Sequence, residues 1–293
     1  MRDVLRLDQT EIEGEAFSVE AFTFPDGTRH IKIKGRGGPR SFSNALIVAR
    51  PKNSDEFIDI ILANDTLKSM GYRDIQLSMP YVLGSRQDRV QGLMREPLSA
   101  DIYASMINSC GFSEVHIWEP HSDVTPALIK NCRVHEGIGR VVLDRHYRDD
   151  MVLIAPDVGA TKRVTKLAEF YCAKVLQGMK DRDPATGKLS GFSLICSKGA
   201  YGGRRGVIVD DCLTNGGTFW GLRNELIEWA DFKELWLVVT HADHETGVRS
   251  MSGKFDKVFI SNSRSNWKCL IDPNCRNVNV VKLGLSLKHG DMI

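Results

Sequence analysis

The sequence of 293 residues contains no apolar stretch long enough to cross a lipid bilayer, so it predicts no membrane-spanning helix and no membrane partner. Its first residues, Met1 to Arg6, lack the apolar core of a signal peptide, and we therefore expect a cytoplasmic protein. The seven cysteines are scattered, without a Cys-x-x-Cys pair or a cluster of cysteine and histidine. This spacing argues against a zinc site and predicts reduced cysteines that pack in the interior.

The sequence also lacks an excess of charge of one sign. Its 39 basic and 37 acidic residues give a formal net charge of +2, and the basic residues are spread among the acids. This distribution gives no reason to expect a nucleic-acid partner. The contents of 42% hydrophobic and 26% charged residues are typical of a globular protein, and the length favours two α/β domains.

Apolar strands and amphipathic helices alternate along the chain, a rhythm that predicts parallel, doubly wound sheets. The first half is predicted to contain a strand pair within Phe17–Lys34, strands at Ala45–Ala49, Ile75–Met79 and Val115–Trp118, and helices at Ser54–Ser69 and Ser99–Cys110. The second half is predicted to contain strands at Met151–Ala155, Phe192–Cys196, Val207–Val209 and Leu235–Thr240, and helices at Thr161–Val175 and Trp220–Trp229. Ser54 is the expected cap of its helix. A charged run near Asp144–Asp150 predicts domains at 1–145 and 146–293.

The stretch from Val207 to Phe219 combines an apolar strand, two adjacent acids and a turn with paired glycines before a helix. Backbone N–H groups of such a turn, together with the helix end, suit a phosphate. Asp210 and Asp211 suit two neighbouring hydroxyls, as on a ribose, or a hydrated divalent cation. The stretch therefore indicates a sugar phosphate site. The alternative is a strand that ends in solvated acids and a tight turn.

Two further segments of the second half carry candidate site residues. Pro156 to Thr161 repeats the order of strand, glycine and helix, which predicts a second anion site that includes Asp157 and Gly159. Gln177 to Gly191 is polar and lacks periodicity, as in a mobile loop or an exposed hairpin. Lys180 and Arg182 on this segment could stabilise developing charge on a substrate, or they could be ordinary surface residues.

The first half carries basic side chains in two loops. Arg86, Gln87 and Arg89 follow a predicted strand, and two guanidinium groups in one loop suit polyphosphate oxygens, although a solvated charge cluster is the alternative. His121 follows the next strand and could bind a metal or a phosphate. A satisfied polar residue at a strand end is the alternative for His121.

Taken in order, these motifs resemble the ribose-phosphate diphosphokinase family, also called PRPP synthetases. The matching segments are Phe24-Pro25-Asp26-Gly27, Pro80-Tyr81, Arg86-Gln87-Asp88-Arg89, Arg95-Glu96-Pro97, His121, Pro156-Asp157-Val158-Gly159, Lys180 with Arg182, and Val209-Asp210-Asp211 with Gly216-Gly217-Thr218. The glycine loop alone also resembles a phosphoribosyltransferase, whereas the arginine loop and the first domain favour the diphosphokinase.

The resemblance implies two phosphoribosyltransferase-like α/β domains, Mg²⁺, and transfer of the β,γ-diphosphoryl group of ATP to the anomeric hydroxyl of ribose 5-phosphate. It assigns Phe24, Asp26, Arg86, Gln87 and Arg89 to ATP, with the contacts of Phe24 and Asp26 often made in a neighbouring subunit. His121 and Asp157 are the implied metal site. His121, Lys180 and Arg182 are the implied catalytic residues. The implied ribose-phosphate and diphosphate ligands are Asp157, Gly159, Asp210, Asp211, Thr214, Asn215, Gly216, Gly217 and Thr218. A shared site also implies a homodimer or a larger homo-oligomer.

Three positions depart from the family pattern. Thr28 stands in place of a usual Glu in the nucleotide turn, and Thr214-Asn215 replaces the usual Asp-Thr in the 5′-phosphate loop. The second departure favours, as an alternative acceptor, a ribose with a larger 5′ group such as ADP-ribose, whose product would serve nucleotide or NAD salvage. A nucleotide-binding protein without catalytic activity that regulates a partner is a further hypothesis.

Overall fold

The computed structural model describes residues 2–8, 17–35, 44–90, 96–182, 189–264 and 275–284. The chain divides into two compact units. The first comprises Met1–His135, Ser263–Ser265 and Gly284–Ile293, and the second comprises Glu136–Asn262 and Asn266–Leu283. The division lies before the charged run at Asp144–Asp150, because the helix that contains the start of this run packs on the sheet of the second unit.

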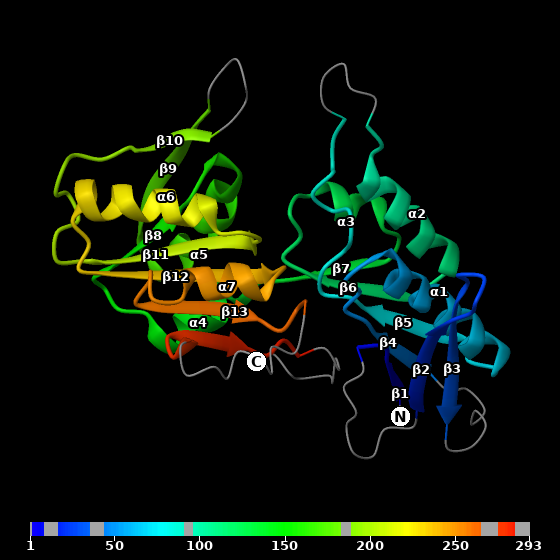
Figure 1. Cartoon of the computed structure of the whole chain (residues 1–293). Coiled ribbons are helices and arrows are strands. Elements are labelled where there is room, and N and C mark those ends of the chain that lie inside the picture. The colour runs from blue at the N-terminus through cyan, green and yellow to red at the C-terminus, as the bar shows by residue number, and fades with distance from the viewer. Residues whose placement is uncertain are drawn as a thin grey trace. The chain divides into compact units, whose positions relative to one another are not determined.

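Among the described residues, the first unit contains a parallel sheet of five strands in the order β1-β4-β5-β6-β7 (Figure 1). The strands are β1 (Arg2–Arg6), β4 (Asn44–Val48), β5 (Asp74–Ser78), β6 (Glu114–Trp118) and β7 (Cys132–His135). The helices of this unit are α1 (Ser54–Ser69), α2 (Ser99–Cys110) and α3 (Val124–Leu128). A separate antiparallel pair, β2 (Phe17–Thr23) and β3 (Arg29–Gly35), confirms the predicted hairpin.

Helix α1 has the predicted bounds but a different cap. Asn53 has an extended backbone, and its side chain accepts a hydrogen bond from the Glu56 backbone N–H at 2.9 Å. Ser54 is instead the first helical residue, and its hydroxyl lies 2.8 Å from the Tyr103 hydroxyl. Asparagine is as good a cap as serine, so Asn53 satisfies a backbone donor of the first turn from one position before the predicted cap.

In the second unit, the described residues form a sheet of seven strands in the order β10-β9-β8-β11-β12-β13-β14. The strands are β8 (Met151–Ala155), β9 (Lys174–Arg182), β10 (Leu189–Leu194), β11 (Arg205–Leu213), β12 (Glu234–Ala242), β13 (Lys257–Ser261) and β14 (Val278–Val281). Only the β9–β10 pair is antiparallel within this described sheet. The predicted α/β fold class, with mostly parallel sheets flanked by helices, is therefore confirmed.

Helices cover both faces of the second sheet (Figure 1). One face carries α4 (Ile138–His146) and α5 (Thr161–Tyr171), and the other carries α6 (Gly217–Glu225), its π-helical continuation η2 (Leu226–Ala230) and α7 (Glu245–Met251). The chain moves from β8 to β9 in one direction along the sheet and from β11 to β12 in the other. Because such crossovers are right-handed, their helices lie on opposite faces.

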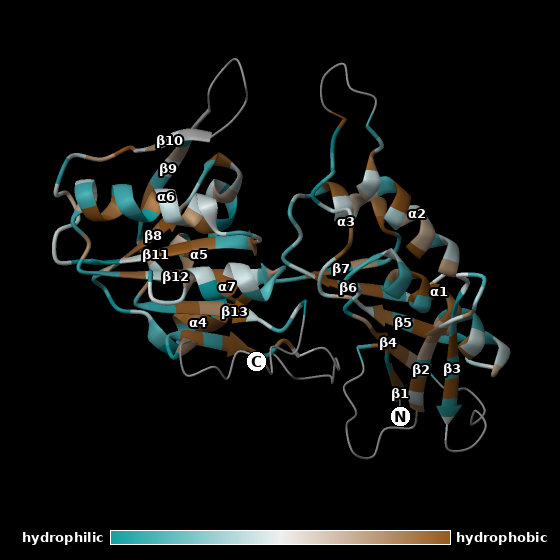
Figure 2. Cartoon of the chain, viewed as in Figure 1, coloured by the Kyte–Doolittle hydropathy of each residue, from teal (hydrophilic) through white to brown (hydrophobic). Residues whose placement is uncertain are grey.

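Burial on both faces gives the strands of both sheets their apolar sequences. The four residues of β4 after Asn44 are buried, as are all five residues of β8. Figure 2 shows these strands as brown segments between more hydrophilic helix surfaces. Buried apolar side chains cluster separately in the two units, around residues such as Phe57 and Leu77 in the first and Ile154 and Leu237 in the second, so each sheet has its own hydrophobic core.

One predicted helix of the second unit ends early, and one predicted polar segment had two alternatives. The helix predicted from Thr161 to Val175 ends at Tyr171, because Cys172 takes a left-handed conformation with φ of 51°. The polar segment Gln177–Gly191 contributes to the antiparallel strands β9 and β10, which favours the hairpin over the loop. Residues 183–188 of this hairpin lie outside the described residues. No helix in the described part of the chain combines the length and hydropathy of a bilayer span.

Candidate active site

The carboxyl ends of β8, β11 and β12 lie at one edge of the second sheet. β8 pairs with β11 from Met151 opposite Arg205 to Ile154 opposite Ile208, and β11 then continues to Leu213. The acids at this edge are Asp157 after β8, Asp210 and Asp211 in the continuation of β11, and Asp243 after β12. The predicted acid pair thus lies within a strand rather than after it. Ligands of open parallel sheets bind at this edge.

Arg163 of α5 holds the two acids of β11 together. Its Nη1 donates to Asp210 Oδ1 at 3.1 Å and lies 3.5 Å from Asp211 Oδ1. The side chains are 18%, 13% and 8% exposed, respectively. Burial and the neighbouring Asp211 carboxylate raise the pKa of Asp210, whereas the Arg163 guanidinium lowers it. Arg163 therefore favours the ionised form of the acid pair.

The sequence interpretation missed Arg163. Its position in the first turn of α5 was the available signal, because the helix dipole disfavours a cation there. A cation at that end indicates acidic partners elsewhere in the fold. Asp210 lies 47 residues after Arg163 in the sequence, however, and the pairing of β8 with β11 brings the two residues close.

The predicted residues Asp157 and Lys180 are brought together. Lys180 Nζ on β9 forms an ion pair with Asp157 Oδ2, with the two side chains 21% and 27% exposed. Asp157 Oδ1 also accepts from the Ala160 backbone N–H at 3.0 Å and so caps the short helix η1 (Val158–Ala160). The carboxylate is thus fixed between the start of α5 and the neighbouring strand.

Glycines allow the β8 loop and β9 to approach closely. A Cβ on Gly178 would lie 3.1 Å from the carbonyl oxygens of Ala155 and Pro156. A Cβ on Gly159 would lie 3.2 Å from Asp157 Oδ1. The predicted residue Arg182 ends β9, and its side chain lies outside the described part of the structure.

The loop after β11 leads into the amino end of α6, as predicted. Gly216 occupies the cap position with φ of 78°, a conformation that favours glycine. Since glycine has no side chain, the cap supplies no acceptor to the first turn. The backbone N–H groups of Gly217, Thr218 and Phe219 have no partner within the helix, so they suit an anion.

The two residues that depart from the family pattern are held by the neighbouring strand and helix. The Thr214 hydroxyl donates to Asp243 Oδ2 at 2.9 Å. The Asn215 carbonyl oxygen lies 3.5 Å from the Ser250 hydroxyl of α7, which donates to the Gly247 carbonyl at 2.7 Å. Asp243 was not predicted as a site residue, because nothing in the sequence relates the end of β12 to the loop after β11.

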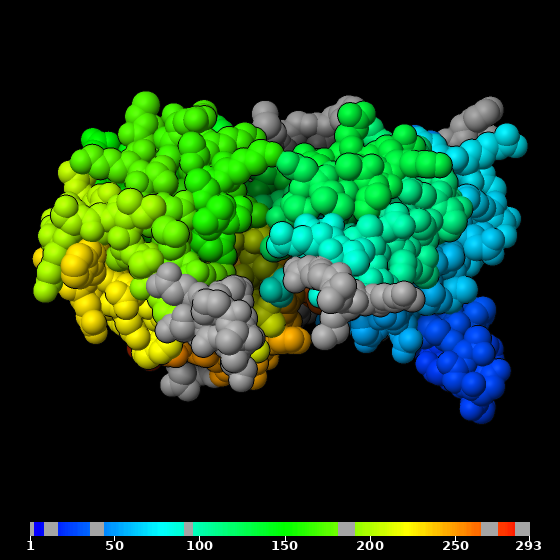
Figure 3. Space-filling view, turned by 90° about the horizontal axis from the view of Figure 1, so that it is seen from above, coloured from blue at the N-terminus to red at the C-terminus, as the bar shows by residue number. Residues whose placement is uncertain are grey.

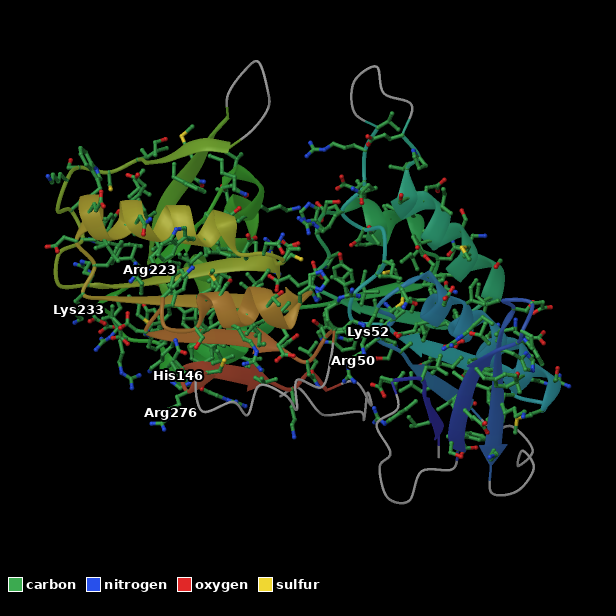
Figure 4. All side chains as sticks on the ribbon, in the orientation of Figure 1. Arg50, Lys52, His146, Arg223, Lys233 and Arg276 are labelled. Atoms are coloured by element: carbon green, nitrogen blue, oxygen red, sulfur yellow. The ribbon has the colours of Figure 1, made fainter. Side chains whose placement is uncertain are left out.

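The opposite edge of the second sheet is also charged, but its charges are paired. Lys233, labelled in Figure 4, has its Nζ 2.8 Å from Asp150 Oδ2. Arg205 contacts both Asp150 and Glu234. Near this edge His146 packs against the rings of Trp236 and Phe259 (ring-centroid distances of 5.9 and 5.5 Å). The edge with the acid pair and the glycine-capped helix is therefore the better candidate site.

In the first unit, the predicted arginine loop follows β5 and is anchored on α2. Gly84 has φ of 77°, and a Cβ there would lie 2.6 Å from the Tyr103 ring. The Gln87 backbone donates to the Gly84 carbonyl at 2.9 Å, and the Gln87 carbonyl accepts from the Ala100 N–H at 3.2 Å. Arg86, Gln87 and Arg89 are exposed. The loop thus presents the predicted ATP-binding residues at the surface.

His121 lies on an exposed loop after β6, at the same edge of the first sheet. The Trp118 backbone N–H donates to the Pro80 carbonyl at 3.0 Å, which ties the end of β6 to the segment after β5. Glu119 then has φ of 35°, and the chain turns toward His121. The described residues contain no group of three His, Cys, Asp or Glu side chains that could hold a metal ion. The implied ligands His121 and Asp157 belong to different units.

The predicted adenine contacts lie on the β2–β3 hairpin, the blue projection in Figure 3. Phe24 is 44% exposed and contacts the Phe22 and His30 rings at centroid distances of 5.0 and 5.5 Å. Asp26 accepts from the Thr28 backbone N–H at 2.9 Å, and this bond lowers the pKa of Asp26. Thr28, which departs from the family pattern, therefore stabilises the turn, and Phe24 presents an aromatic surface.

No protein-family model matches the sequence. A ribose-phosphate pyrophosphokinase of Pyrococcus abyssi is 26% identical over 260 residues, which cover 85% of this chain and 85% of the relative. A ribose-phosphate pyrophosphokinase of Maricaulis maris is 28% identical over 242 residues, which cover 80% of this chain and 74% of the relative.

A solved structure resembles most of the chain. The phosphoribosylpyrophosphate synthetase of Mycobacterium smegmatis has a TM-score of 0.75 at 18% sequence identity, and the match covers 91% of this chain and 86% of the synthetase. This likeness confirms the predicted phosphoribosyltransferase-like fold. The sequence relatives confirm the resemblance that the ordered motifs predict.

Proposed function

We propose that this chain, which is homologous to the ribose-phosphate pyrophosphokinases, transfers the β,γ-diphosphoryl group of ATP to the anomeric hydroxyl of a ribosyl acceptor. One observation carries the proposal: a buried acid pair and a glycine-capped helix end occupy the same edge of the second sheet. Carboxylates suit neighbouring hydroxyls, and the helix end suits a phosphate. Ribose 5-phosphate carries both groups, and it is the first acceptor that we propose.

In this proposal the acceptor binds to β11 and the loop that follows it. Asp210 and Asp211 accept hydrogen bonds from the ribose hydroxyls, while Arg163 opposes the rise in the pKa of Asp210 and fixes the orientation of both acids. Gly216, Gly217 and Thr218 surround the 5′ group with backbone donors. Thr214 and Asn215 lie in the loop immediately before this helix end.

The proposed reaction is an in-line displacement at the β-phosphorus of ATP. The anomeric hydroxyl gives up its proton to solvent, and its oxygen forms the new bond to the β-phosphorus. The bond from the β-phosphorus to the oxygen shared with the α-phosphorus breaks, and AMP leaves with that oxygen. Lys180 and Arg182 neutralise charge that develops on the transferred group, and His121 contacts the triphosphate. Positioning and charge neutralisation then supply the catalysis, and no protein nucleophile is required.

Magnesium is the metal that we propose, since it would neutralise phosphate charge and orient the triphosphate. Mg²⁺ commonly takes only one or two protein carboxylates and completes its coordination with phosphate oxygens and water. The described residues fit this mode better than a preformed protein site, because they contain no group of three potential ligands. Asp157 would hold the ion on release from Lys180, and His121 would lie near it.

The first unit would bind the nucleotide. Arg86, Gln87 and Arg89 would contact the triphosphate, because their exposed loop combines guanidinium forks with an amide. Phe24 would stack on adenine and Asp26 would lie beside it, and we propose that the hairpin serves a neighbouring copy of the chain. This arrangement implies a homodimer or a larger homo-oligomer, and we propose that the enzyme works in the cytoplasm.

A second candidate acceptor is a ribose with a larger 5′ group, such as ADP-ribose. The Thr214 hydroxyl is directed at Asp243, so the loop differs from the family pattern in chemistry as well as in sequence. The diphosphorylated product would then serve nucleotide or NAD salvage. A nucleotide-binding regulator without catalytic activity is the remaining alternative, but the pairing of Lys180 with Asp157 at the same edge as the acid pair favours an enzyme.

The test is AMP release from ATP and Mg²⁺, measured separately with ribose 5-phosphate and with ADP-ribose. AMP formation with ribose 5-phosphate supports the first acceptor, and a faster reaction with ADP-ribose supports the second. Formation of the anomeric diphosphate should match AMP formation one to one. Nucleotide binding without AMP release for either acceptor would reject the diphosphokinase proposal and favour the regulator.

A further inference from the structure

Asp243 holds the loop after β11 from the end of the adjacent strand. Its Oδ2 accepts a hydrogen bond from the Thr214 hydroxyl at 2.9 Å and one from Cys212 Sγ at 3.5 Å. Its backbone N–H donates to the Leu213 carbonyl oxygen at 2.9 Å. Asp243, directly after β12, thus contacts the last two residues of β11 and the first residue of the loop that follows it.

Helix α7 supports the following peptide groups. A Cβ on Gly247 would lie 1.8 Å from the Thr214 carbonyl oxygen, so the close approach of α7 requires glycine. The Ser250 hydroxyl donates to the Gly247 carbonyl oxygen at 2.7 Å and contacts the Asn215 carbonyl oxygen at 3.5 Å. The loop therefore rests on β12 and α7 immediately before the first turn of α6.

The direction of the Thr214 hydrogen bond follows from the chemistry of its partner. An ionised carboxylate only accepts hydrogen bonds, so the single hydroxyl hydrogen of Thr214 points toward Asp243. The hydroxyl hydrogen then cannot serve a bound 5′ group. The backbone N–H groups at the start of α6 remain the principal donors, and their placement depends on the loop that Asp243 anchors.

We propose that Asp243 is a positioning residue for the acceptor site: by binding Thr214 it fixes the loop whose amide groups receive the acceptor's 5′ group. This inference rests on the proposed function and adds to it a residue from a different strand. It also explains how the loop is ordered although Thr214 stands where the matched pattern has an acid. The carboxylate is supplied by the neighbouring strand end instead of by the loop.

The arrangement predicts a reciprocal pair of substitutions. Thr214→Asp alone would place two carboxylates in contact, whereas Asp243→Asn combined with Thr214→Asp would pair the introduced carboxylate with an amide donor. Affinities for ribose 5-phosphate and ADP-ribose are measured by calorimetry, with each acceptor titrated separately. We expect Thr214→Asp to weaken binding of the preferred acceptor about tenfold or more and Asp243→Asn to weaken it about three- to tenfold.

The double variant is expected to bind that acceptor within about threefold of the wild-type chain, because a charge-assisted hydrogen bond is restored with its donor and acceptor exchanged. The KM for ATP should stay within about twofold in all three variants, which a general loss of structure would not allow. Asp256→Asn is the matched control. It removes one acid at the other edge of the sheet, where Asp256 accepts from the Leu235 N–H at 2.8 Å.

Additive losses in the double variant would overturn the inference, as would a Thr214→Asp chain that binds the acceptor normally. Either result would leave the proposed function intact if the wild-type chain releases AMP. Failure of the wild-type chain to bind either acceptor would reject both proposals. Thermal midpoints of the variants provide a second measurement, since contact between the two positions predicts that the second substitution recovers stability lost in the first.

Discussion

At the scale of single residues, the ion pairs of the candidate site differ in how far they are buried. Asp210 and Asp211 share the largely buried Arg163, whereas Asp157 and Lys180 form a more exposed pair next to the start of α5. A partly exposed ion pair contributes little to stability, but a buried acid pair without its cation is strongly disfavoured. The two cations therefore have different expected roles, with Lys180 serving turnover and Arg163 serving the charge state of the acids.

Lys180→Ala should lower turnover by roughly two to four decades while leaving the thermal midpoint nearly unchanged, because it removes a preorganised cation from the transferred group. The measurements are AMP release with the preferred acceptor and thermal unfolding. Lys233→Ala is the matched control, since Lys233 also pairs with one aspartate of the same unit, Asp150, at the opposite edge. Near-normal AMP release by Lys180→Ala would reject the assigned role.

Arg163→Met should shift the acid limb of the activity profile toward higher pH. The pKa of Asp210 is already raised by burial and by Asp211, and Arg163 opposes that rise. Without the guanidinium the ionised form of Asp210 loses its stabilising partner. The pKa of Asp210 therefore rises further, and a larger fraction of Asp210 is protonated at neutral pH. We expect kcat/KM for the acceptor to fall about tenfold or more at pH 7 and to recover in part as the pH is raised.

The check is kcat/KM for the acceptor between pH 5.5 and 9 in wild type, Arg163→Met and Arg163→Lys. The lysine variant keeps a cation and should lie between the other two. Profiles of Arg163→Met and wild type that differ only by a constant factor would show that Arg163 does not act through Asp210.

At the scale of helices and strands, local patterns predict most elements but not their junctions. The bounds of α1 and α2 follow from apolar periodicity, and β8 follows from its continuous apolar run. The end of α5 was wrong because periodicity continues past Cys172, where the left-handed backbone ends the helix. Arg163 and Asp243 were not predicted because their partners come from other strands, and such contacts depend on sheet order and register.

Gly247→Ala should destabilise the second unit by roughly 2 to 4 kcal/mol, because its Cβ would overlap the Thr214 carbonyl and force α7 from the loop. The measurement is the free energy of unfolding in urea. Gly217→Ala is a control for stability alone: a Cβ there meets no atom within 4 Å. Equal unfolding free energies for the two variants would contradict the close packing of α7 against the loop.

At the scale of the whole molecule, the two units are not consecutive pieces of chain. The chain returns to the first unit at Ser263–Ser265, where Arg264 donates to the Pro51 carbonyl at 2.8 Å and lies 4.4 Å from the Tyr81 ring centroid. A cut between His135 and Glu136 would therefore remove this contact from the first unit. The full chain is therefore the appropriate form for functional tests. The proposal also includes an assembly of several copies of the chain.

If the hairpin of one copy completes the nucleotide site of another, two defective variants should complement each other. Phe24→Ala removes an exposed aromatic ring from the hairpin, and Lys180→Ala removes the catalytic cation. In a mixed cyclic assembly with random placement, about one quarter of the sites would receive an intact hairpin from one variant and an intact Lys180 from the other. AMP release by the re-associated mixture, measured at ATP below the wild-type KM, should exceed the sum of the separate variants and approach that fraction of wild-type activity.

Native mass spectrometry verifies that mixed assemblies form. Mixed assemblies without a gain in activity would place the hairpin in its own subunit's site, because in that arrangement neither variant can supply what the other lacks.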